Sequence, residues 1–456
     1  MKKIIIFSTA YLPMIGGAEL AVHEIAARLG DFSARGGPAS GWELDLICAR
    51  LRRDLEPAMR LLPSAVKKQE KIGRINVYRV GFGSKIDKLL LPFFGFLKAR
   101  QIYKDCQRCH LERSRVKRDE VKDLVSGDEI LHGVYPEFNR RVQNDKNEIK
   151  VVIWGIMASW GSAAAWLFKI FYPRVPFLLT LQEGDAEKYI QEGRLGLINI
   201  GWRLILKKAD FVQVISNYLA KMARKYGYRG EIDVVPNGVD LKMYNVSCIK
   251  HDSEKIKSRL GISSNDKIII TVSRLVEKNG IGDLISAVGL LDTLYPPAGD
   301  HPQGGKTQNT KLLVLGSGPL RRRLEDSVGG LGLQDKVFFL GDISNEEVPK
   351  YLAIADIFVR PSLSEGLGTA FLEAMATGVP IIGTPVGGIP DFLKNSETGL
   401  FCEVKNPASI AKKIKLLLED DDLRSKIIRN ARQLIEERYS WDKIAPQMAE
   451  IFDKIA

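Results

Sequence analysis

The sequence predicts an α/β protein built from two doubly wound parallel sheets. Short runs of β-branched residues alternate with helical patterns from one end of the chain to the other, a rhythm typical of repeated strand-helix-strand units. At 456 residues the chain is too long for one ordinary hydrophobic core and fits two domains of roughly 200 residues each. The composition, with 45% hydrophobic and 27% charged residues, is that of a globular protein.

The predicted strands are short apolar runs in both halves of the chain. Ligands of a doubly wound sheet bind at the carboxyl ends of its strands, so we expect the functional residues in the loops that follow these runs. The runs are 3–8, 44–48, 150–154, 177–181 and 211–215 in the first half, and 268–272, 312–315, 337–340, 357–359 and 381–382 in the second.

The boundary between the halves is predicted at a turn-forming cluster, where Asn237 and Gly238 follow a strand-like run. A last helix is expected to begin after Ser440, a predicted N-cap, and to cross back to the first domain. Two segments without the strand-helix rhythm are predicted insertions: the first, rich in charge, is a solvated helix or a mobile loop, and the second is a surface loop. The predicted division is 1–235 with 440–456 as the first domain, 236–439 as the second, and insertions at about 112–147 and 296–310.

Net charge and cysteine content limit the classes of partner and the cellular compartment that we expect. The formal net charge of +12 implies an anionic partner, either a phosphorylated substrate, an acidic lipid or a nucleic acid. No nucleic-acid motif with interleaved aromatic residues is visible, so we expect no nucleic-acid partner. Five scattered cysteines favour a reducing compartment, and no apolar stretch reaches the about 18 residues that span a bilayer. These features predict a cytoplasmic protein.

The most informative segment runs from a glycine-rich loop into a helix at residues 364–373. Gly366 and Gly368 allow the backbone to approach a ligand closely, and the first N–H groups of the helix that follows are unpaired donors that attract phosphate. Glu365 and Glu373 flank this anion site, and carboxylates there suggest hydroxyl groups as their partners. A sugar nucleotide has this distribution of groups, with a diphosphate in the middle and a polyol at each end.

Other loops after predicted strands fit the same ligand. Gly16 and Gly17 stand between the first strand and a helix, where backbone amides can approach a phosphate or a substrate hydroxyl. Arg274 and Lys278 follow the run 268–272, and they would offer a phosphate a pair of N–H donors and a point charge. Further glycine turns that enter helices lie at Gly316 and Gly318, and at Gly387 and Gly388.

The ordered set of these motifs resembles glycosyltransferase family 4, a family of retaining enzymes with the GT-B fold. The resemblance covers nearly the whole chain apart from the two insertions. It implies two Rossmann-like domains that face a cleft, and transfer of a sugar from a nucleotide-diphosphate sugar to a saccharide or lipid-linked hydroxyl acceptor in polysaccharide, lipopolysaccharide or glycolipid synthesis. The motifs are Gly16-Gly17-Ala18-Glu19, Pro236-Asn237-Gly238-Val239-Asp240, Ser273-Arg274-Leu275-Val276, Gly316-Ser317-Gly318-Pro319, the segment from Glu365 to Glu373, and Tyr439-Ser440-Trp441.

The resemblance also implies roles for individual residues. Arg274 and Lys278 would hold the donor diphosphate, and Glu365 would bond the hydroxyls of the sugar. The leaving phosphate would help to deprotonate the acceptor, with no metal ion and no other cofactor held by the protein. The remaining donor contacts would come from Gly16 and Gly17, from Gly316 and Gly318, from the amides around Gly366, Gly368 and Thr369, and from Glu373 at the ribose.

Two departures from the family pattern concern a lysine and a histidine. Family members often have lysine directly before the glycine that corresponds to Gly280, where this chain has Asn279. Many members have a histidine after the strand 177–181, where this chain has Gln182, which can bond a sugar hydroxyl but cannot shuttle a proton. We therefore expect Asp185 or Glu183 to contact the acceptor or to act as a base.

Alternatives stay open at this point. A GT-B sugar-nucleotide epimerase or a phosphorylase would share the donor site, and a nucleotide-sugar-binding protein without catalysis would fit the glutamine at position 182. Residues 85–98 and 195–208 join apolar faces to lysine and arginine. They are either core helices with basic outer faces or a surface in peripheral contact with anionic lipid at the inner face of the membrane, which would suit a lipid-linked acceptor.

Overall fold

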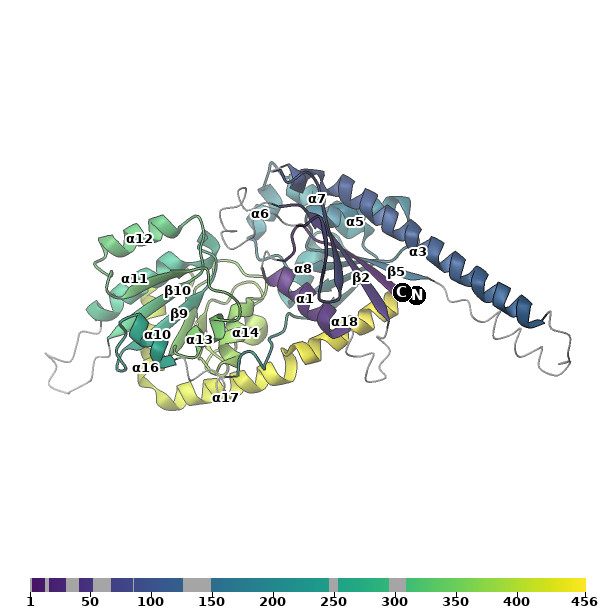
Figure 1. The fold of residues 1–456 in the computed structure, drawn as a ribbon. Coiled ribbons are helices and arrows are strands. Elements are labelled where there is room, and N and C mark those ends of the chain that lie inside the picture. Colours follow the sequence, from purple (N-terminus) through teal and green to yellow (C-terminus); the bar gives the residue numbers. More distant parts are fainter. Residues whose placement is uncertain are drawn as a thin grey trace.

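Two parallel sheets, each covered by helices on both faces, make up the protein (Figure 1). The computed structural model describes residues 2–12, 16–29, 41–51, 67–84, 86–125, 149–245, 253–294 and 309–456. The predicted fold class is confirmed, since the alternation of strands and helices folds into two α/β domains.

The first sheet has the strand order β3-β4-β2-β1-β5-β6-β7-β8. Its strands are parallel except β3, which pairs antiparallel with β4 at the edge. The side chains of β1 alternate: Ile4 and Ile6 enter the core on one face, and Ile5 and Phe7 enter the core on the other. The strands are β1 (Lys2–Phe7), β2 (Trp42–Ala49), β3 (Gln69–Ile72), β4 (Ile75–Val80), β5 (Lys150–Ile156), β6 (Phe177–Leu181), β7 (Phe211–Val214) and β8 (Glu231–Val234).

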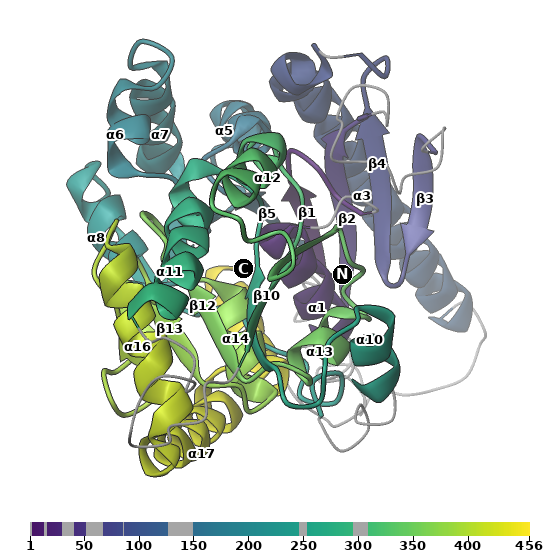
Figure 2. The same ribbon diagram turned by 90° about the vertical axis from the view of Figure 1, so that its left-hand side faces the viewer.

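Helices from both ends of the chain cover the first sheet. α1 (Gly17–Leu29) packs with the C-terminal helix α18 (Trp441–Ile455) on one face. The other face is covered by α3 (Asp87–Val125), α5 (Trp160–Phe171) and α7 (Leu197–Lys208), which lie side by side (Figures 1 and 2). Two shorter helices are α6 (Glu187–Glu192) and α8 (Asn217–Lys225).

The second sheet is parallel throughout, with the strand order β11-β10-β9-β12-β13-β14. Its strands are β9 (Lys267–Val272), β10 (Thr310–Leu315), β11 (Val337–Gly341), β12 (Ile357–Arg360), β13 (Ile381–Gly383) and β14 (Leu400–Phe401). One face packs against α11 (Ile281–Leu294), α12 (Arg321–Gly330) and α16 (Pro407–Glu419), and the other against α10 (Ser253–Arg259), α13 (Val348–Leu352), α14 (Thr369–Ala376), α15 (Ile389–Phe392) and α17 (Asp421–Arg438). A short 3-10 helix, η4 (Glu277–Asn279), follows β9.

Strand order reverses between β1 and β5 in the first sheet and between β9 and β12 in the second. Loops at such reversals diverge to opposite faces of the sheet and leave a crevice at the carboxyl ends of the strands. The predicted site residues follow β1, β6, β9, β10 and β12, so the fold places them at this edge of each sheet.

The chain passes between the domains at two adjacent points. Val239, in the segment that leaves the first domain, forms a parallel bridge with Ser440, at the start of α18. The Val239 N–H donates to the carbonyl oxygen of Tyr439 (2.7 Å), and the Trp441 N–H donates to the carbonyl oxygen of Val239 (3.2 Å). The predicted return of the last helix is thus confirmed, and Ser440 lies at the N-cap position, although its side chain makes no capping bond.

All the predicted strands are present, with ends within two residues of the prediction. The structure adds β3, β4 and β14, which the sequence pattern did not mark, and β8 is the strand-like run expected before Asn237. Within the described ranges, every helix is too short or too polar to span a bilayer. The charged segment 112–147 is helical up to Val125, as the last part of α3, and residues 126–147 lie outside the described residues. Most of the segment 296–310 also lies outside them, and the exact domain boundaries stay a prediction.

Candidate functional site

The two domains touch at Gly184, in the loop after β6. A Cβ built on Gly184 would lie 3.1 Å from the Gly366 nitrogen, 3.3 Å from Nζ of Lys278 and 3.4 Å from Oε1 of Glu365. The hydroxyl of Ser364 donates to the carbonyl oxygen of Gly184 (3.1 Å). The first domain therefore lies directly against the lysine and the glutamate that the sequence assigns to the donor, and a side chain at position 184 would crowd them.

Lys278 forms an ion pair with Asp185 across the domain interface, with 3.0 Å between Nζ and Oδ1. Both side chains are partly exposed, at 37% and 45%. The adjacent Asn279 is buried, and its amide donates to the carbonyl oxygen of Arg274 (2.7 Å). The departure from the family pattern at position 279 thus has a structural role: Asn279 closes the loop of Arg274, while Lys278 faces the first domain.

Glu365 is held by Arg360, the last residue of β12. An Nη atom of Arg360 donates to Oε2 of Glu365, and the guanidinium lies 4.8 Å from the ring centre of Phe371. Both charged side chains are largely buried, with 7% and 17% exposed. Arg360 is absent from the sequence motifs, although a basic residue at the end of a strand is the same signal that marked Arg274.

The N-termini of α1 and α14 approach each other across the interface. A Cβ built on Gly17 would lie 3.9 Å from Oγ1 of Thr369, the first residue of α14. Gly368, at the N-cap of α14, has a φ of 94°, which favours glycine. The partial positive charge of a helix N-terminus attracts anions, so this part of the interface suits phosphate.

Gly16 precedes α1 and lies against Glu19 of the same helix. The carboxylate of Glu19 accepts hydrogen bonds from backbone N–H groups at Gly16 and Glu19, and burial raises the pKa of Glu19. The free N–H groups at the N-terminus of α1 therefore already have a hydrogen-bond acceptor in part, the side chain of Glu19 in the same helix.

Glu373 lies further along α14, away from Lys278. Burial raises the pKa of Glu373 to about 7, against the opposing effects of a hydrogen bond with Tyr244 and the charge of Arg360. Tyr244 is buried and comes from the segment between the domains. No local sequence motif predicts its contact with Glu373, because Tyr244 is far from Glu373 in the sequence.

Gly316 and Gly318 support the loop that carries Arg274. The Leu275 N–H donates to the carbonyl oxygen of Ser317 (2.9 Å), and a Cβ on Gly318 would lie 2.7 Å from the Leu275 nitrogen. The two glycines thus allow two backbones to pack closely, and a role in phosphate binding stays a prediction. Arg274 itself is exposed.

Three polar residues after β6 have different surroundings. Gln182 accepts a hydrogen bond from the side chain of Asn237 at Oε1 (3.1 Å), which ties it to the segment between the domains. Glu183 is buried, accepts hydrogen bonds from the N–H groups of Ala158 and Gln182, and has its pKa raised by burial to about 7. Of the two carboxylates considered for the acceptor, Asp185 faces the second domain and Glu183 braces the loop after β5.

Buried polar atoms without a hydrogen-bond partner gather where β9 and β12 end: Oγ1 of Thr271, Oγ of Ser273, Nε of Arg360 and Oγ of Ser362. They make this end of the second sheet polar. Within the described ranges, no three His, Cys, Asp or Glu side chains gather where they could hold a metal ion, and a reaction without metal stays a prediction.

Two protein-family models match the chain, one in each half. Residues 252–434 match the model described as glycosyl transferases group 1, and residues 109–243 match glycosyltransferase family 4. The chain is 31% identical over 281 residues to N-acetyl-alpha-D-glucosaminyl L-malate synthase of Bacillus anthracis, a match that covers 61% of this chain and 68% of that protein. It is 26% identical over 269 residues to the GDP-mannose-dependent alpha-(1-6)-phosphatidylinositol monomannoside mannosyltransferase of Mycobacterium tuberculosis, with coverages of 55% and 66%.

The chain spans only part of the length of its curated relatives, 54% of one of them. Solved structures are similar over the whole chain. The complex of Anabaena HepE with UDP and glucose has a TM-score of 0.67 at 18% identity and covers 99% of both chains. The family models, the relative from B. anthracis and the two facing parallel sheets agree with one another. This chain therefore belongs to the glycosyl transferases group 1 family and has the GT-B fold.

Proposed function

We propose that the protein is a retaining glycosyltransferase that moves a sugar from a nucleotide-diphosphate sugar to a hydroxyl acceptor. The observation that carries the proposal is the arrangement at the interface. Lys278 and Glu365 of the second domain meet Gly184 and Asp185 of the first, and the N-terminus of α14 approaches Gly17 of the first domain. Cationic, carboxylate and amide groups thus stand together where the diphosphate and hydroxyls of a donor can be bound.

Each group has one task in the proposed reaction. Arg274, Lys278 and the amides of Gly368 and Thr369 bind the diphosphate and stabilise its charge as it leaves. Glu365 accepts hydrogen bonds from the sugar hydroxyls, and Glu373 from the ribose. The bond from the anomeric carbon to the phosphate oxygen breaks, and the bond to the acceptor oxygen forms on the same face of the sugar. The acceptor proton goes to the leaving phosphate.

The acceptor is proposed to lie on the side of the first domain, near Gln182 and Asp185. Polysaccharide, lipopolysaccharide or glycolipid assembly in the cytoplasm, at the inner face of the membrane, is the proposed setting. One relative is named for action on a phosphatidylinositol monomannoside, which supports a lipid-linked acceptor.

The donor is tested first, with a thermal-shift panel of UDP-, GDP-, ADP- and TDP-sugars, because a ligand that binds the folded state raises its apparent stability. Radiolabelled transfer from the stabilising donor then tests the site residues. Arg274→Ala and Glu365→Gln are expected to reduce transfer at least about a hundredfold, whereas Arg322→Ala on the exposed surface of α12 keeps it. Glutamine is the sharper change at position 365, since alanine would leave the buried Arg360 without its partner.

The products separate the proposed function from its alternatives. Release of an epimer or of free sugar without an acceptor would indicate an epimerase, and a requirement for inorganic phosphate would indicate a phosphorylase. Donor binding without turnover by any acceptor would favour a protein that only binds nucleotide sugars.

A further inference from the structure

Two polar side chains lie in the interior of the first sheet, among apolar neighbours. Thr180 is the polar residue of β6, which reads FLLTL, and Gln213 is the polar residue of β7, which reads FVQV. Both are buried, with 1% and 3% exposed, and they stand opposite each other in the strand register. A buried polar group costs free energy unless it is hydrogen-bonded, so each of the two needs a partner inside the sheet.

A chain of three hydrogen bonds supplies these partners and crosses β5, β6 and β7. The indole Nε1 of Trp154 in β5 donates to the hydroxyl of Thr180 (2.8 Å), which donates in turn to Oε1 of Gln213 (2.7 Å). Nε2 of Gln213 then donates to the carbonyl oxygen of Val235, directly after β8 (2.5 Å). These four residues are called the polar relay.

The chemistry of tryptophan sets the direction of the polar relay. An indole N–H can only donate, so the Thr180 hydroxyl that accepts it uses its own hydrogen for Gln213. The Gln213 oxygen is then occupied, and its N–H2 group turns to the Val235 carbonyl. The Trp154 ring is itself held, because it packs edge-on against Phe452 of α18 with ring centres 5.1 Å apart. The donors therefore all point toward the segment between the domains.

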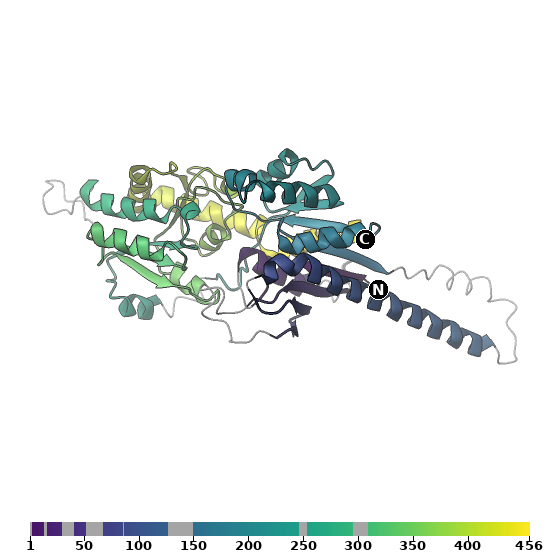
Figure 3. The same ribbon diagram turned by 90° about the horizontal axis from the view of Figure 1, so that it is seen from above.

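The polar relay ends where this segment begins. Both backbone groups of Val235 are bound by β7, because its N–H also donates to a carbonyl oxygen of that strand (2.9 Å). Pro236 restricts the backbone after it, and Asn237 follows with 5% exposed. On the other side of Asn237, Val239 forms the bridge with Ser440. Figure 3 shows from above how the yellow C-terminal helix crosses between the domains. The backbone that carries Asn237 is thus held on both sides.

Asn237 in turn orients Gln182. Its Nδ2 donates to Oε1 of Gln182 (3.1 Å), so the oxygen of that amide is occupied. Among the described residues, Nε2 of Gln182 has no hydrogen-bond partner, and the side chain is partly exposed. Gln182 follows Thr180 by two positions, so both side chains leave the chain on the same side, one pair nearer to the carboxyl edge of the sheet. The N–H2 group is the part of Gln182 that is left for a ligand.

We propose that the polar relay is a set of positioning residues for Gln182, which it fixes through Asn237 with the N–H2 group toward the acceptor. The identity of that ligand rests on the proposed function. An N–H that donates to the acceptor oxygen holds this oxygen in place and leaves the hydroxyl hydrogen free to pass to the leaving phosphate. A carbonyl or carboxylate oxygen in the same place would compete for that hydrogen. The orientation of the amide therefore decides whether Gln182 helps or hinders the proton transfer.

Steady-state kinetics of matched variants of the full chain test the polar relay. Thr180→Val removes the hydroxyl at nearly constant shape and is expected to lower kcat about tenfold, while the donor KM and the donor thermal shift change little. Thr180→Ser restores the hydroxyl and should recover most of kcat. The matched control is Tyr228→Phe, which removes a buried hydroxyl that donates to the carbonyl oxygen of Asp210, just before β7 (3.1 Å). Its kcat should equal that of the wild type.

The orientation of the Gln182 amide is tested separately. Asn237→Asp puts an acceptor beside Gln182, so the amide should turn its N–H2 group inward, and kcat should fall at least about tenfold. Gln182→Glu, which has no N–H2 group, should fall as far, and Gln182→His, which keeps an N–H donor beside an acceptor nitrogen, should recover part of kcat.

NMR of isotope-labelled glutamine side chains follows the orientation without any activity. The N–H2 signal of Gln213 is expected to exchange with water at least about tenfold more slowly than that of Gln182. The signal of Gln182 should shift in Asn237→Asp and should not shift in Tyr228→Phe.

Equal kcat in folded Thr180→Val and in the control would overturn the proposal, as would a Gln182 signal that Asn237→Asp leaves unchanged. Should Thr180→Val fail to fold, Asn237→Asp takes its place in the kinetic comparison. Expected NMR results in a protein that transfers sugar from no donor would support the orientation of Gln182 and contradict the proposed function. Transfer at the wild-type rate by all the variants would support the proposed function and contradict the positioning role.

Discussion

Arg360 fixes the geometry of Glu365, a residue on which the proposed reaction depends. Its guanidinium is buried, holds one carboxylate oxygen of Glu365, lies over Phe371 and donates to the carbonyl oxygen of Val272 (3.4 Å). A planar donor with several N–H groups can make these contacts at once, which lysine cannot. We therefore assign Arg360 as a positioning residue for the carboxylate that is proposed to face the sugar.

Arg360→Met is expected to lower kcat about tenfold to a hundredfold while the donor KM changes less. Without Arg360 the Glu365 carboxylate would take several orientations, and only a few of them would hold the donor in a reactive position. Arg360→Lys should recover part of kcat, since it restores the charge without the second donor. The kcat and KM of the three proteins, with thermal unfolding as the folding control, check this. An unchanged kcat in the folded methionine variant would contradict the assignment.

Glu183 gives the protein a stability that depends on pH. Burial raises its pKa to about 7, above the ordinary glutamate value, so the folded state holds the proton more tightly than the unfolded chain. The stabilising contribution is complete below the unfolded pKa and is lost as pH rises through about 7, by on the order of 3 kcal/mol. Glu183→Gln should make the fall in the free energy of unfolding between pH 5 and pH 8 less steep, measured by urea denaturation, and Glu373, whose pKa is also raised to about 7, accounts for a remaining fall. An equally steep fall in this variant would assign the pH dependence to another group.

At the level of elements, the sequence predicted the strands that are buried on both faces and the apolar edge strand β11, and it did not mark the less covered strands β3, β4 and β14. β6 reads FLLTL and is wholly buried, so its composition marks it directly. β3 reads QEKI and is only half covered, because an edge strand needs no continuous apolar run. Burial on one face or none therefore set the limit of the prediction.

Part of the candidate site could likewise be predicted from the sequence, and part of it could not. Lys278, Glu365 and Gly366 stand in local motifs, and their approach to one edge of the sheet follows from strand order, which the alternation of elements predicts. The contacts of Gln182 with Asn237 and of Glu373 with Tyr244 join distant segments through side-chain geometry. No sequence pattern fixes such contacts.

The packing of α18 on the first domain contributes to the free energy of unfolding, and this contribution can be measured. Phe452 is fully buried and packs against Trp42 and Trp154, with ring centres 6.2 Å and 5.1 Å apart. Phe452→Ala should lower the free energy of unfolding by about 3–5 kcal/mol, whereas Lys443→Ala on the exposed face of α18 should change it little. Tryptophan fluorescence during urea unfolding reports the transition. A variant as stable as wild type would show that α18 is not part of the first core.

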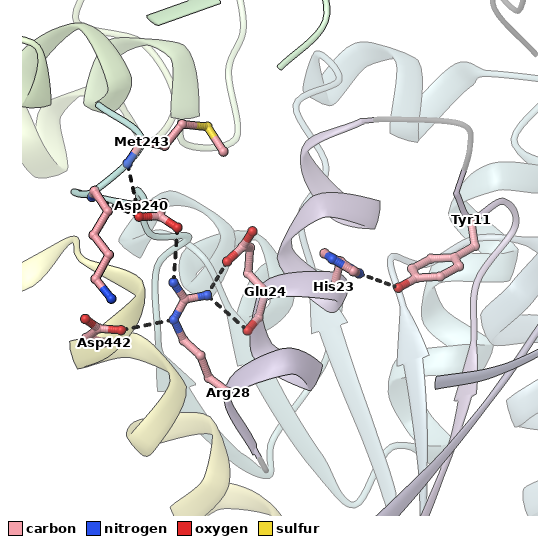
Figure 4. A network of polar contacts seen from close by, with 8 residues as sticks. Tyr11, His23, Glu24, Arg28, Asp240, Met243 and Asp442 are labelled. Carbon is pink, nitrogen blue, oxygen red and sulfur yellow. Dashed lines mark hydrogen bonds and ion pairs between the residues drawn. The ribbon is translucent and has the colours of Figure 1, made fainter. Parts of the chain in front are cut away.

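In the whole molecule, charges join the three segments at the crossing point between the domains (Figure 4). Arg28 of α1 donates to Asp442 of α18 at Oδ1 (3.1 Å), contacts Asp240 of the connecting segment (3.5 Å) and pairs with Glu24. The bridge between Val239 and Ser440 lies at the same point. The domains are thus tied at this hinge and meet again at the candidate site, where Lys278 pairs with Asp185.

The ion pair between Lys278 and Asp185 predicts how the relative position of the domains responds to a change of charge. The pair is partly exposed, so its own contribution is at most about 1 kcal/mol, and Asp185→Asn should have a small effect. Asp185→Lys places two cations face to face and should separate the domains, which small-angle scattering would record as a larger radius of gyration, while the donor thermal shift persists. Adding Lys278→Asp restores an attractive pair and the smaller radius, yet it removes from the second domain the cation proposed to bind the diphosphate. The double variant should therefore be compact and bind donor about tenfold more weakly. If the radius does not change in Asp185→Lys, the remaining contacts hold the domains together, among them the hinge and the hydrogen bond from Ser364 to Gly184. If the compact double variant binds donor normally, Lys278 belongs to the interface and not to the donor site.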